Sequence, residues 1–328
     1  MQAVRATKAV ATMRAVGQDA LGGPEVLKVV EAVRPEPGFA EVLVRVRAAG
    51  VNPTDSWHRA TGGIAGLSGE AVPPVRLGWD LSGVVESVGP GVTIFRAGDE
   101  VFGMPRHPVP AGTYAEYVVS PARHLAHKPA ALTHTEAAAL PLAALTAWQA
   151  LVDTAGVRPG QRVLIHAAAG GVGHLAVQIA KARGAYVIGT ASAAKHGFLR
   201  GLGADELVDY TTADFAETVR DVDVVLDAVG GAYGPRSLRT LRAGGVHVAL
   251  ASPAEAYLAA EAELLGLRAG FMAVEADGAG LREIAALVER GLLRAAVEAV
   301  LPLERVGEAH ALMDTRRTSG KIVLTVSE

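Results

Sequence analysis

The sequence predicts an α/β protein of two domains, one rich in β-strands and one built on a doubly wound parallel sheet. The chain has 328 residues, which is long for a single hydrophobic core. Residues 13–134 contain short alternating strands broken by Gly and Pro clusters. After residue 135, apolar strands alternate with helical segments, and strands spaced by helices pair in parallel.

The β-rich part begins near Met13. The run 41–46 alternates apolar and polar residues, which is the period of a half-buried strand. Another strand is expected over 83–88, before a Gly-Pro-Gly turn, and the run 101–103 resumes the β pattern. We therefore expect a barrel or sandwich in this part of the chain.

The rest of the chain alternates between the two element types. The expected strands cover 163–166, 186–190, 207–210, 222–228 and 246–251. Beyond Val274 we expect a helix over 281–290, a strand over 300–303, a helix over 305–313 and a closing strand over 321–326. We expect this tail to rejoin the β-rich part. The predicted domains are thus 1–136 with 275–328, and 137–274.

A glycine turn joins the first strand of the second domain to an amphipathic helix. The turn contains Gly170, Gly171, Val172 and Gly173, and the helix places His174 and Gln178 on the face opposite its apolar stripe. Glycines let the backbone approach a pyrophosphate, and a helix N-terminus offers free N–H groups to it. The order strand, turn, helix, strand predicts a dinucleotide cradle. The alternative is a helix start that packs without a ligand.

The residues after the next strand indicate which dinucleotide binds. NAD sites carry an acidic residue there, but this chain has Ser192 and Lys195 and no acid in 190–195. Ser192 can donate a hydrogen bond and Lys195 supplies a charge, so NADP is favoured over NAD. Tyr210 is expected to lean over the same phosphate. The alternatives are a solvated Lys195 and an aromatic residue at the rim.

Later strands are expected to complete the crevice. Val229, Leu250 and Ser252 follow strands of the predicted parallel sheet, at the carboxyl ends. Ligands of doubly wound sheets bind at this edge. We therefore expect these residues to line the nicotinamide side.

Composition excludes several classes of protein. The formal net charge is −3 with both signs interspersed, so neither nucleic acid nor an anionic membrane is an expected partner. No apolar run is long enough for a membrane span. There is no cysteine, which excludes disulfides and thiolate metal sites. We expect a cytoplasmic protein, with residues 1–12 a disordered tail rather than a targeting leader.

Several motifs occur together in one order along the chain. They are Ala49–Asp55, Gly78–Asp80, Gly112–Val118, Leu145–Trp148, Ala168–Gly173 and Gly320–Val323. In these motifs the chain resembles the medium-chain dehydrogenase/reductase superfamily, in its zinc-free, zeta-crystallin-like quinone oxidoreductase branch. The resemblance implies a GroES-like catalytic domain made from both chain ends, a Rossmann domain between them, NADPH, and a homodimer joined at the sheet edge.

The same resemblance assigns roles to individual residues. It implies that Thr146 lies near the nicotinamide carboxamide and that Asn52 lies beside the position of hydride transfer. Asp55 is expected to orient the loop. Arg316 and Lys321 are similar to family positions near the cofactor.

The resemblance also draws attention to what the chain lacks. Zinc-dependent relatives have Cys where this chain has Asn52, and a His-Glu pair where it has Trp79 and Asp80. Without a Lewis acid the substrate must be easier to reduce, as quinones and α,β-unsaturated carbonyl compounds are. We therefore expect hydride transfer from NADPH to one of these classes. The alternatives are a pathway-specific enoyl reductase and a non-catalytic NADPH-binding protein.

The sequence leaves three possible sources for the proton and indicates the substrate pocket through two loops. Many zinc-free relatives carry a tyrosine where this chain has Trp57, and an indole N–H is too weak an acid to deliver a proton. The proton then comes from His58, from Tyr114 or from solvent, and solvent is favoured. The loops 61–69 and 104–108 are expected to bound the substrate pocket.

Overall fold

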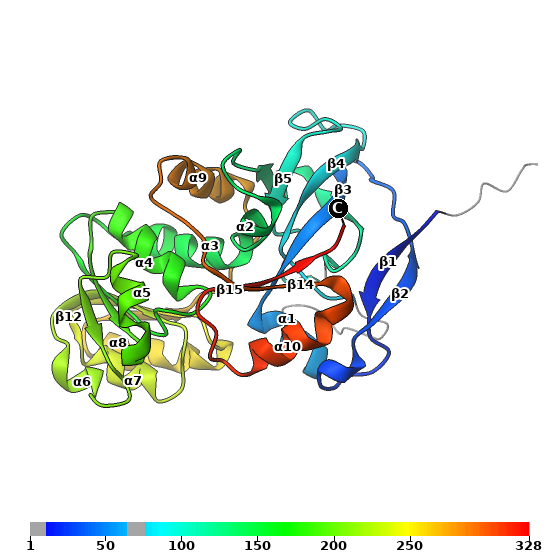
Figure 1. Ribbon diagram of the computed structural model, residues 1–328. Helices are drawn as coiled ribbons and strands as arrows, with labels where there is room; N and C mark the ends of the chain where they lie inside the picture. Colours follow the sequence, from blue (N-terminus) through cyan, green and yellow to red (C-terminus); the bar gives the residue numbers. More distant parts are fainter. Residues whose placement is uncertain (1–10, 64–75, 110, 328) are drawn as a thin grey trace, which may run out of the picture.

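The structure is a computed structural model that describes residues 11–63, 76–109 and 111–327. Two lobes are visible in Figure 1, each built on its own β-sheet. Residues 64–69 of the expected substrate loop, and residues 1–10 of the expected tail, lie outside the described residues.

The β-rich lobe contains a seven-stranded sheet in the order β14-β15-β3-β4-β5-β7, with β6 paired to β3. A separate antiparallel hairpin, β1 with β2, lies beside it (Figure 1). The bounds are β1 Thr12–Gly17, β2 Lys28–Val33, β3 Glu41–Val51, β4 Leu81–Val88, β5 Glu100–Gly103, β6 Tyr117–Pro121, β7 Leu125–His127, β14 Val297–Pro302 and β15 Lys321–Thr325.

Both ends of the described chain contribute to this sheet. Strand β15 pairs antiparallel with β3, with Ile322 opposite Val51 and Thr325 opposite Ala48. On its other side β15 pairs in parallel with β14. The tail therefore returns to the first lobe after the chain has built the second.

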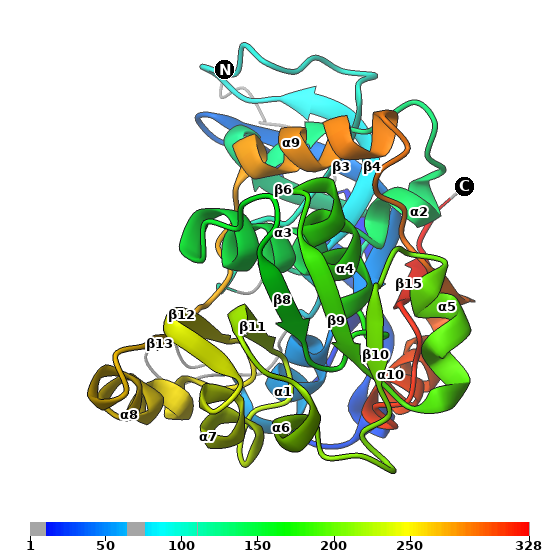
Figure 2. The same cartoon turned by 90° about the vertical axis from the view of Figure 1, so that its left-hand side faces the viewer.

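The second lobe contains a six-stranded sheet in the order β10-β9-β8-β11-β12-β13, and all five neighbouring pairs are parallel. Figure 2 shows these strands side by side. The order reverses between β8 and β11, and ligands of such sheets bind outside the carboxyl ends at that point. The bounds are β8 Arg162–Ile165, β9 Tyr186–Thr190, β10 Glu206–Val208, β11 Val222–Asp227, β12 Leu241–Ala249 and β13 Arg268–Phe271.

Helices cover the parallel sheet and join the lobes. Helix α4 packs on β8 and β9, α7 on β11 and β12, and α8 on β13, while α3 and α9 pack against each other. The bounds are α1 Pro53–Thr61, α2 His134–Ala138, α3 Pro141–Trp148, α4 Gly173–Ala182, α5 His196–Arg200, α6 Phe215–Thr218, α7 Tyr233–Leu238, α8 Leu258–Leu264, α9 Gly278–Glu289 and α10 Val306–Asp314. The predicted fold class, a β-rich domain plus a domain built on a doubly wound parallel sheet, is confirmed.

The structure differs most from the prediction at one strand and one helix. The strand expected over 246–251 is β12, which starts at Leu241 and ends at Ala249. Within the segment expected to be β-like, the structure has the nine-residue helix α1. That helix is stabilised by a capping box, in which the Asp55 side chain accepts the backbone N–H of Asn52 at 2.7 Å.

Helix α4 is buried on both faces, which corrects the expectation that His174 and Gln178 lie away from the packed side. Both residues are buried: His174 is 0% exposed and Gln178 is 6% exposed. Gln178 exchanges two hydrogen bonds with the backbone of Arg294, and His174 Nε2 accepts the N–H of Ala296 at 3.1 Å. The polar face of α4 therefore binds a segment that leads back to the first lobe.

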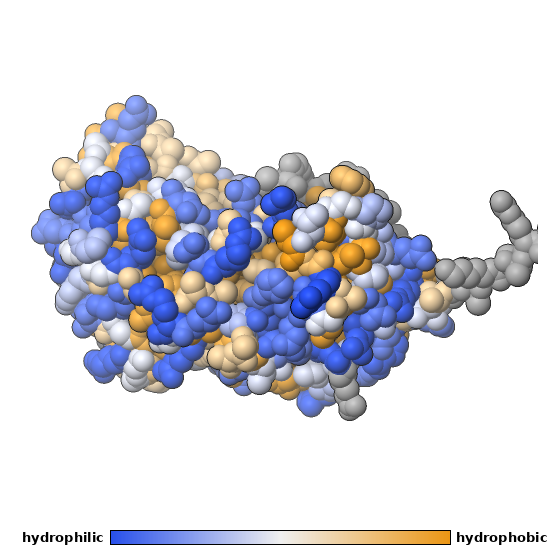
Figure 3. Space-filling model, turned by 90° about the horizontal axis from the view of Figure 1, so that it is seen from above, coloured by the Kyte–Doolittle hydropathy of each residue, from blue (hydrophilic) through white to orange (hydrophobic). Residues whose placement is uncertain are grey.

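The surface agrees with the interspersed charge of the sequence. Figure 3 shows one face on which hydrophilic residues predominate and hydrophobic residues form separate patches. Among the described residues, no helix has the length and hydropathy needed to cross a membrane.

Candidate active site

The first part of the site is the junction between β3 and α1. Asn52 is the N-cap of α1, and its backbone N–H binds the carboxylate of Asp55. The other oxygen of Asp55 accepts the N–H of Gly78 at 3.0 Å. Asp55 thus ties the start of α1 to the residues that precede β4.

Asp55 is fully buried, and its environment changes its chemistry. Burial raises its pKa to about 7, although hydrogen bonding to the Asn52 backbone acts in the opposite direction. Tyr114 lies nearby and is itself buried, so its pKa is raised well above its usual value. A phenol that holds its proton this strongly is a poor acid near neutral pH.

A buried lysine connects the site to the C-terminal strand. The Lys321 ammonium donates to the carbonyl of Val51 at 3.1 Å, to Oδ1 of Asn52, and to the carboxylate of Asp80 at 3.3 Å. Asn52 Nδ2 in turn donates to Asp80 at 2.9 Å. The side chains of Lys321 and Asp80 are 2% and 0% exposed, so the pair is removed from solvent.

Asp80 also fixes a helix. Its second carboxylate oxygen accepts the N–H of Leu142 at 2.7 Å, in the first turn of α3. Thr146, one turn later, donates its hydroxyl to the Leu142 carbonyl at 2.6 Å and is 7% exposed. The network therefore connects β3, the start of β4, α3 and β15.

An aromatic stack lies beside this network. The His58 ring is 4.6 Å from the Trp79 ring, and Trp79 is 5.7 Å from His107. Burial lowers the pKa of His58, whose Nδ1 donates to the Thr54 carbonyl at 2.8 Å. Its Nε2 is buried and has no hydrogen-bond partner among the residues that the structure describes. His58 is therefore a neutral imidazole near pH 7.

The glycine turn has the close packing that its residue types predict. Gly170, Gly171 and Val172 are half-buried, and Gly173 begins α4. A Cβ on Gly173 would lie 2.7 Å from Cα of Ala168, and one on Gly171 would lie 3.3 Å from Cδ of Lys321. A side chain at Gly173 would therefore collide with the backbone, and this close approach of the chain fits a cradle for a pyrophosphate.

Lys195, in the turn after β9, binds a segment of the chain that leads into β15. Its ammonium donates to the carbonyls of Arg317 at 2.7 Å and Thr318 at 3.2 Å. Ser192 precedes this turn and is half-buried, while Tyr210 is 53% exposed. Arg316 is exposed and has a positive φ of 55°. The protein groups thus hold Lys195 through main-chain carbonyls, with no acidic side chain bonded to it.

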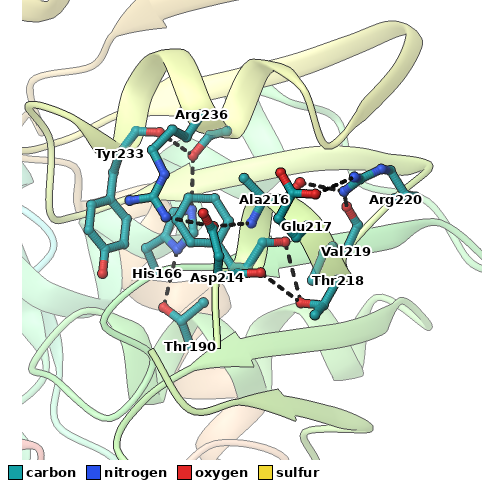
Figure 4. Close-up of polar contacts among 12 residues, drawn as sticks. His166, Thr190, Asp214, Ala216, Glu217, Thr218, Val219, Arg220, Tyr233 and Arg236 are labelled. Atoms are coloured by element: carbon teal, nitrogen blue, oxygen red, sulfur yellow. Dashed lines mark hydrogen bonds and ion pairs between the residues drawn. The ribbon is translucent and has the colours of Figure 1, made fainter. Parts of the chain in front are cut away.

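A buried histidine, His166, directly follows β8 at the carboxyl edge of the parallel sheet (Figure 4). His166 Nε2 is 2.9 Å from the Ser237 hydroxyl, and Nδ1 is 3.1 Å from the Thr190 hydroxyl. Because Ser237 donates to the Tyr233 carbonyl, it must accept from Nε2, which makes Nδ1 the acceptor. Burial lowers the pKa of His166 to about 4, so the neutral ring is the stable form.

Figure 4 also shows Arg236, Asp214 and Tyr233, which lie near this histidine. Arg236 on α7 pairs with Asp214 at 2.5 Å and lies over the ring of Phe215, 4.8 Å from its centroid. Phe215 and Tyr233 each contact the His166 ring edge to face. Aromatic rings therefore enclose the end of β8.

The predicted nicotinamide-side residues lie at the ends of β11 and β12. Val229 is 43% exposed, and its N–H binds Asp227 at 2.9 Å. Leu250 is half-buried, and its N–H binds the Asp227 carbonyl at 2.8 Å. Ser252 is half-buried and accepts the N–H of Ala254. These residues belong to the same edge of the sheet as the glycine turn.

The sequence analysis omitted Asp80 from its candidate site residues. The structure makes Asp80 the common partner of Asn52, Lys321 and Leu142. A signal was present, because Asp80 belongs to the Gly78–Asp80 motif and apolar residues follow it. An aspartate inside such a run is buried only when it is paired.

The donor set around Asn52 does not suit a zinc ion. Asn52 and Asp80 are already bonded to one another and to Lys321, and the indole N–H of Trp79 donates to the Val109 carbonyl at 3.0 Å. Catalytic zinc takes thiolate, imidazole and carboxylate ligands with one open position. Across the described residues, no cluster of three His, Cys, Asp or Glu side chains is placed to hold a metal.

Two family models match the chain. The Alcohol dehydrogenase GroES-like domain matches residues 38–130, and the family described as Zinc-binding dehydrogenase matches residues 202–324. NAD(P)H oxidoreductase RTN4IP1, mitochondrial, of Mus musculus is 36% identical over an alignment 324 residues long, which covers 87% of this chain and 82% of that protein. A 2-haloacrylate reductase of a Burkholderia species is 36% identical over 92% of this chain and 96% of its own length.

Solved structures agree with these relatives. The quinone oxidoreductase from Coxiella burnetii has a TM-score of 0.91 and 36% identity, covering 97% of this chain and all of that one. The Escherichia coli quinone oxidoreductase complexed with NADPH has a TM-score of 0.83 and 29% identity, covering 96% of this chain and all of that one. The chain therefore belongs to the medium-chain dehydrogenase/reductase superfamily, in the branch that contains the quinone oxidoreductases.

Proposed function

We propose that the protein transfers a hydride from NADPH to a quinone or to the β-carbon of an α,β-unsaturated carbonyl compound. One observation carries this proposal: the glycine cradle of a dinucleotide lies against Lys321, which is bonded to Asn52. A relative is named a 2-haloacrylate reductase, and solved structures of similar fold are quinone oxidoreductases. Both substrate classes place developing negative charge on oxygen.

NADPH is the expected reductant, and it supplies the hydride when bound. Gly170, Gly171, Val172 and Gly173 are proposed to hold the pyrophosphate through main-chain N–H groups. Ser192, Lys195 and Tyr210 are proposed to recognise the extra phosphate. The segment 190–195 has no acidic residue that would repel that phosphate.

Thr146, Val229, Leu250 and Ser252 are proposed to line the nicotinamide side, and Arg316 to lie near the cofactor. Asn52 is proposed to donate to the substrate oxygen, and Asp55 to hold the loop. His58 remains a candidate proton donor, but its lowered pKa and buried Nε2 favour water as the proton source. We propose that the reaction needs no zinc, because the Asn52 amide oxygen and the Asp80 carboxylate, the oxygen atoms that a metal would take, already accept hydrogen bonds from buried protein groups.

A panel of acceptors tests the proposed activity. Oxidation of NADPH would be followed by absorbance with quinones, enones and acyl thioesters, before and after treatment with a chelator. Turnover with quinones or simple enones, unchanged by chelation, is the expected result. Turnover confined to acyl thioesters would favour a pathway-specific enoyl reductase. Tight NADPH binding with no acceptor oxidising it would favour a non-catalytic binding protein.

We also propose a homodimer joined at strand β13. This strand pairs only with β12 among the described strands, so its outer edge is open. Leu264 and Leu265, just before it, are 89% and 54% exposed. Analytical ultracentrifugation of Leu264→Asp with Leu265→Asp is expected to show a monomer, while Val33→Asp on the exposed hairpin leaves the dimer intact. A wild-type monomer would refute the proposal.

The domain boundaries and location remain proposals. We place the cofactor domain at 137–274, between two parts of the catalytic domain, and limited proteolysis within the 137 and 275 junctions would test it. We propose a cytoplasmic location, although one relative is named mitochondrial. Fractionation of cells expressing the tagged chain tests this.

A further inference from the structure

We infer that Lys321 is a positioning residue that acts on the substrate through Asn52 rather than by binding the cofactor. The inference rests on the proposed function. It is carried by the hydrogen bonds of the Lys321 ammonium, which end on Val51, Asn52 and Asp80.

The ammonium has no hydrogen left for a ligand. A lysine carries three N–H donors, and the structure gives them three acceptors: a carbonyl, an amide oxygen and a carboxylate. The side chain is 2% exposed. A phosphate or carboxamide of the cofactor would therefore have to displace one of these buried bonds.

The same bonds fix the orientation of the Asn52 amide. Lys321 can only donate, so it must face Oδ1, and the Asp80 carboxylate can only accept, so it must face Nδ2. Nδ2 carries two hydrogens, and the described residues give it the single acceptor Asp80. One N–H of Asn52 therefore has no acceptor among these residues. Asn52 is 1% exposed, so water does not satisfy this N–H from bulk solvent, and we assign the missing acceptor to a substrate oxygen.

Lys321 also strengthens that donor. An ammonium bonded to an amide oxygen withdraws electron density, and hydrogen bonds polarise one another in a buried network. Asp80 balances the charge, and the Asp55 carboxyl and His174 imidazole are the next titratable groups around Lys321. In this arrangement the Asn52 amide lies between the Lys321 ammonium and the substrate oxygen.

The lysine stem transmits position from the cofactor turn. A Cβ on Gly171 would lie 3.3 Å from Lys321 Cδ, and the N–H of Gly320 binds the Ala169 carbonyl at 2.9 Å. The glycine turn thus lies beside the outer part of the Lys321 side chain, whose ammonium binds Asn52. Movement of the turn displaces the amide with it.

The chemical step needs nothing beyond the proposed reactants. The β-carbon of an enone receives the hydride, the nicotinamide is oxidised to NADP⁺, and the C=C electron pair ends on the carbonyl oxygen as an enolate. The free N–H of Asn52 stabilises that oxygen. Water then protonates the α-carbon and leaves the saturated carbonyl compound.

A double-mutant cycle tests the inference, using Lys321→Met, Asn52→Ala and both together, with exposed Lys28→Met as the matched control. Lys321→Met is expected to lower kcat for an enone on the order of tenfold to a hundredfold. The NADPH Kd should change less than about threefold, and the double variant should be no slower than Asn52→Ala. The primary isotope effect with deuterated NADPH should rise in Lys321→Met.

Three results would overturn the inference: an NADPH Kd weakened about tenfold with kcat unchanged, rate losses that multiply in the double variant, or wild-type rates in Lys321→Met. Lys321→Met leaves the Asp80 charge buried, so Lys321→Met with Asp80→Asn provides a neutral pair that keeps an acceptor for Leu142. If the wild type reduces no acceptor, the proposed function fails instead.

Discussion

Lys195 Nζ lies 2.7 Å from the carbonyl oxygen of Arg317, and this hydrogen bond joins the turn after β9 to the segment between α10 and β15. Thr318 offers a second carbonyl at 3.2 Å. A phosphate at this position would share an ammonium that is already held in place. Less rotamer entropy is then lost on binding.

Lys195→Ala is therefore expected to weaken NADPH binding on the order of tenfold to a hundredfold, because a charge-assisted hydrogen bond is lost. The NADH affinity should change little, since NADH lacks the extra phosphate. Isothermal titration with both nucleotides measures the two affinities, and Lys28→Ala is the control. Unchanged NADPH affinity, with NADH bound no worse, contradicts the assignment.

Gly173→Ala is expected to weaken both NADPH binding and stability. The added Cβ would lie 2.7 Å from the Ala168 backbone, so the cradle must shift. Gly197→Ala is a matched control, because nothing lies within 4 Å of a Cβ there and the residue is in α5. That control should gain about 0.5–1 kcal/mol in helix stability. Thermal melts with and without NADPH compare the two variants. Equal melting temperatures and equal shifts by NADPH would contradict the role of Gly173.

Asp80→Ala is expected to lose about 3–5 kcal/mol of unfolding free energy, because it leaves the Lys321 ammonium buried without a counter-charge. The N–H of Leu142 also loses its acceptor. Asp80→Asn keeps that acceptor and should cost less. Urea denaturation measures both, with exposed Asp19→Ala as a control. A loss no larger than the control's would contradict a buried ion pair at this place.

Acid is expected to destabilise the fold between about pH 6.5 and pH 4. Burial lowers the pKa of both His166 and His174 to about 4, so the unfolded chain binds protons that the folded chain refuses. Stability therefore falls as pH decreases through this window, by roughly 1.4 kcal/mol per pKa unit and group. The pKa of Asp55 is raised to about 7, so protonation of this carboxyl stabilises the fold as the pH falls. This is one group acting against two histidines.

The hydrogen bonds of the two histidines predict the same loss of stability at low pH. His174 Nε2 accepts the N–H of Ala296, so protonation of that nitrogen places two donors face to face. Protonation of His166 Nδ1 removes the lone pair that accepts from the Thr190 hydroxyl. Urea midpoints at pH 7, 6 and 5 measure the effect, and His174→Gln should flatten the slope. Equal midpoints at pH 7 and pH 5 would contradict it.

The cofactor lobe was predictable because its signals are local. The glycine turn at Gly170–Gly173 and the apolar strand before it lie within a few residues, and period alone identifies α4. Helix α1 was missed although Asn52 and Asp55 have capping-box spacing and Pro53 occupies the first helical position, because the surrounding residues follow a β pattern.

The site was less predictable because its contacts are distant in sequence. Lys321 and Asn52 are 269 residues apart, and no periodicity connects them. His174 and Gln178 are polar and follow the exposed face of an amphipathic pattern, yet a segment from the other end of the chain buries them. Tertiary packing overrides the pattern wherever two lobes meet.

The late arrival of β15 has a consequence during synthesis on the ribosome. Val51 and Asp80 are made early, but their partners Ile322 and Lys321 emerge only after the entire nucleotide-binding lobe. Until then a nascent catalytic lobe has an unpaired strand edge on β3 and an uncompensated interior carboxylate. Chaperone capture of stalled chains is expected to be strongest in that interval, and to end when the last strand is added.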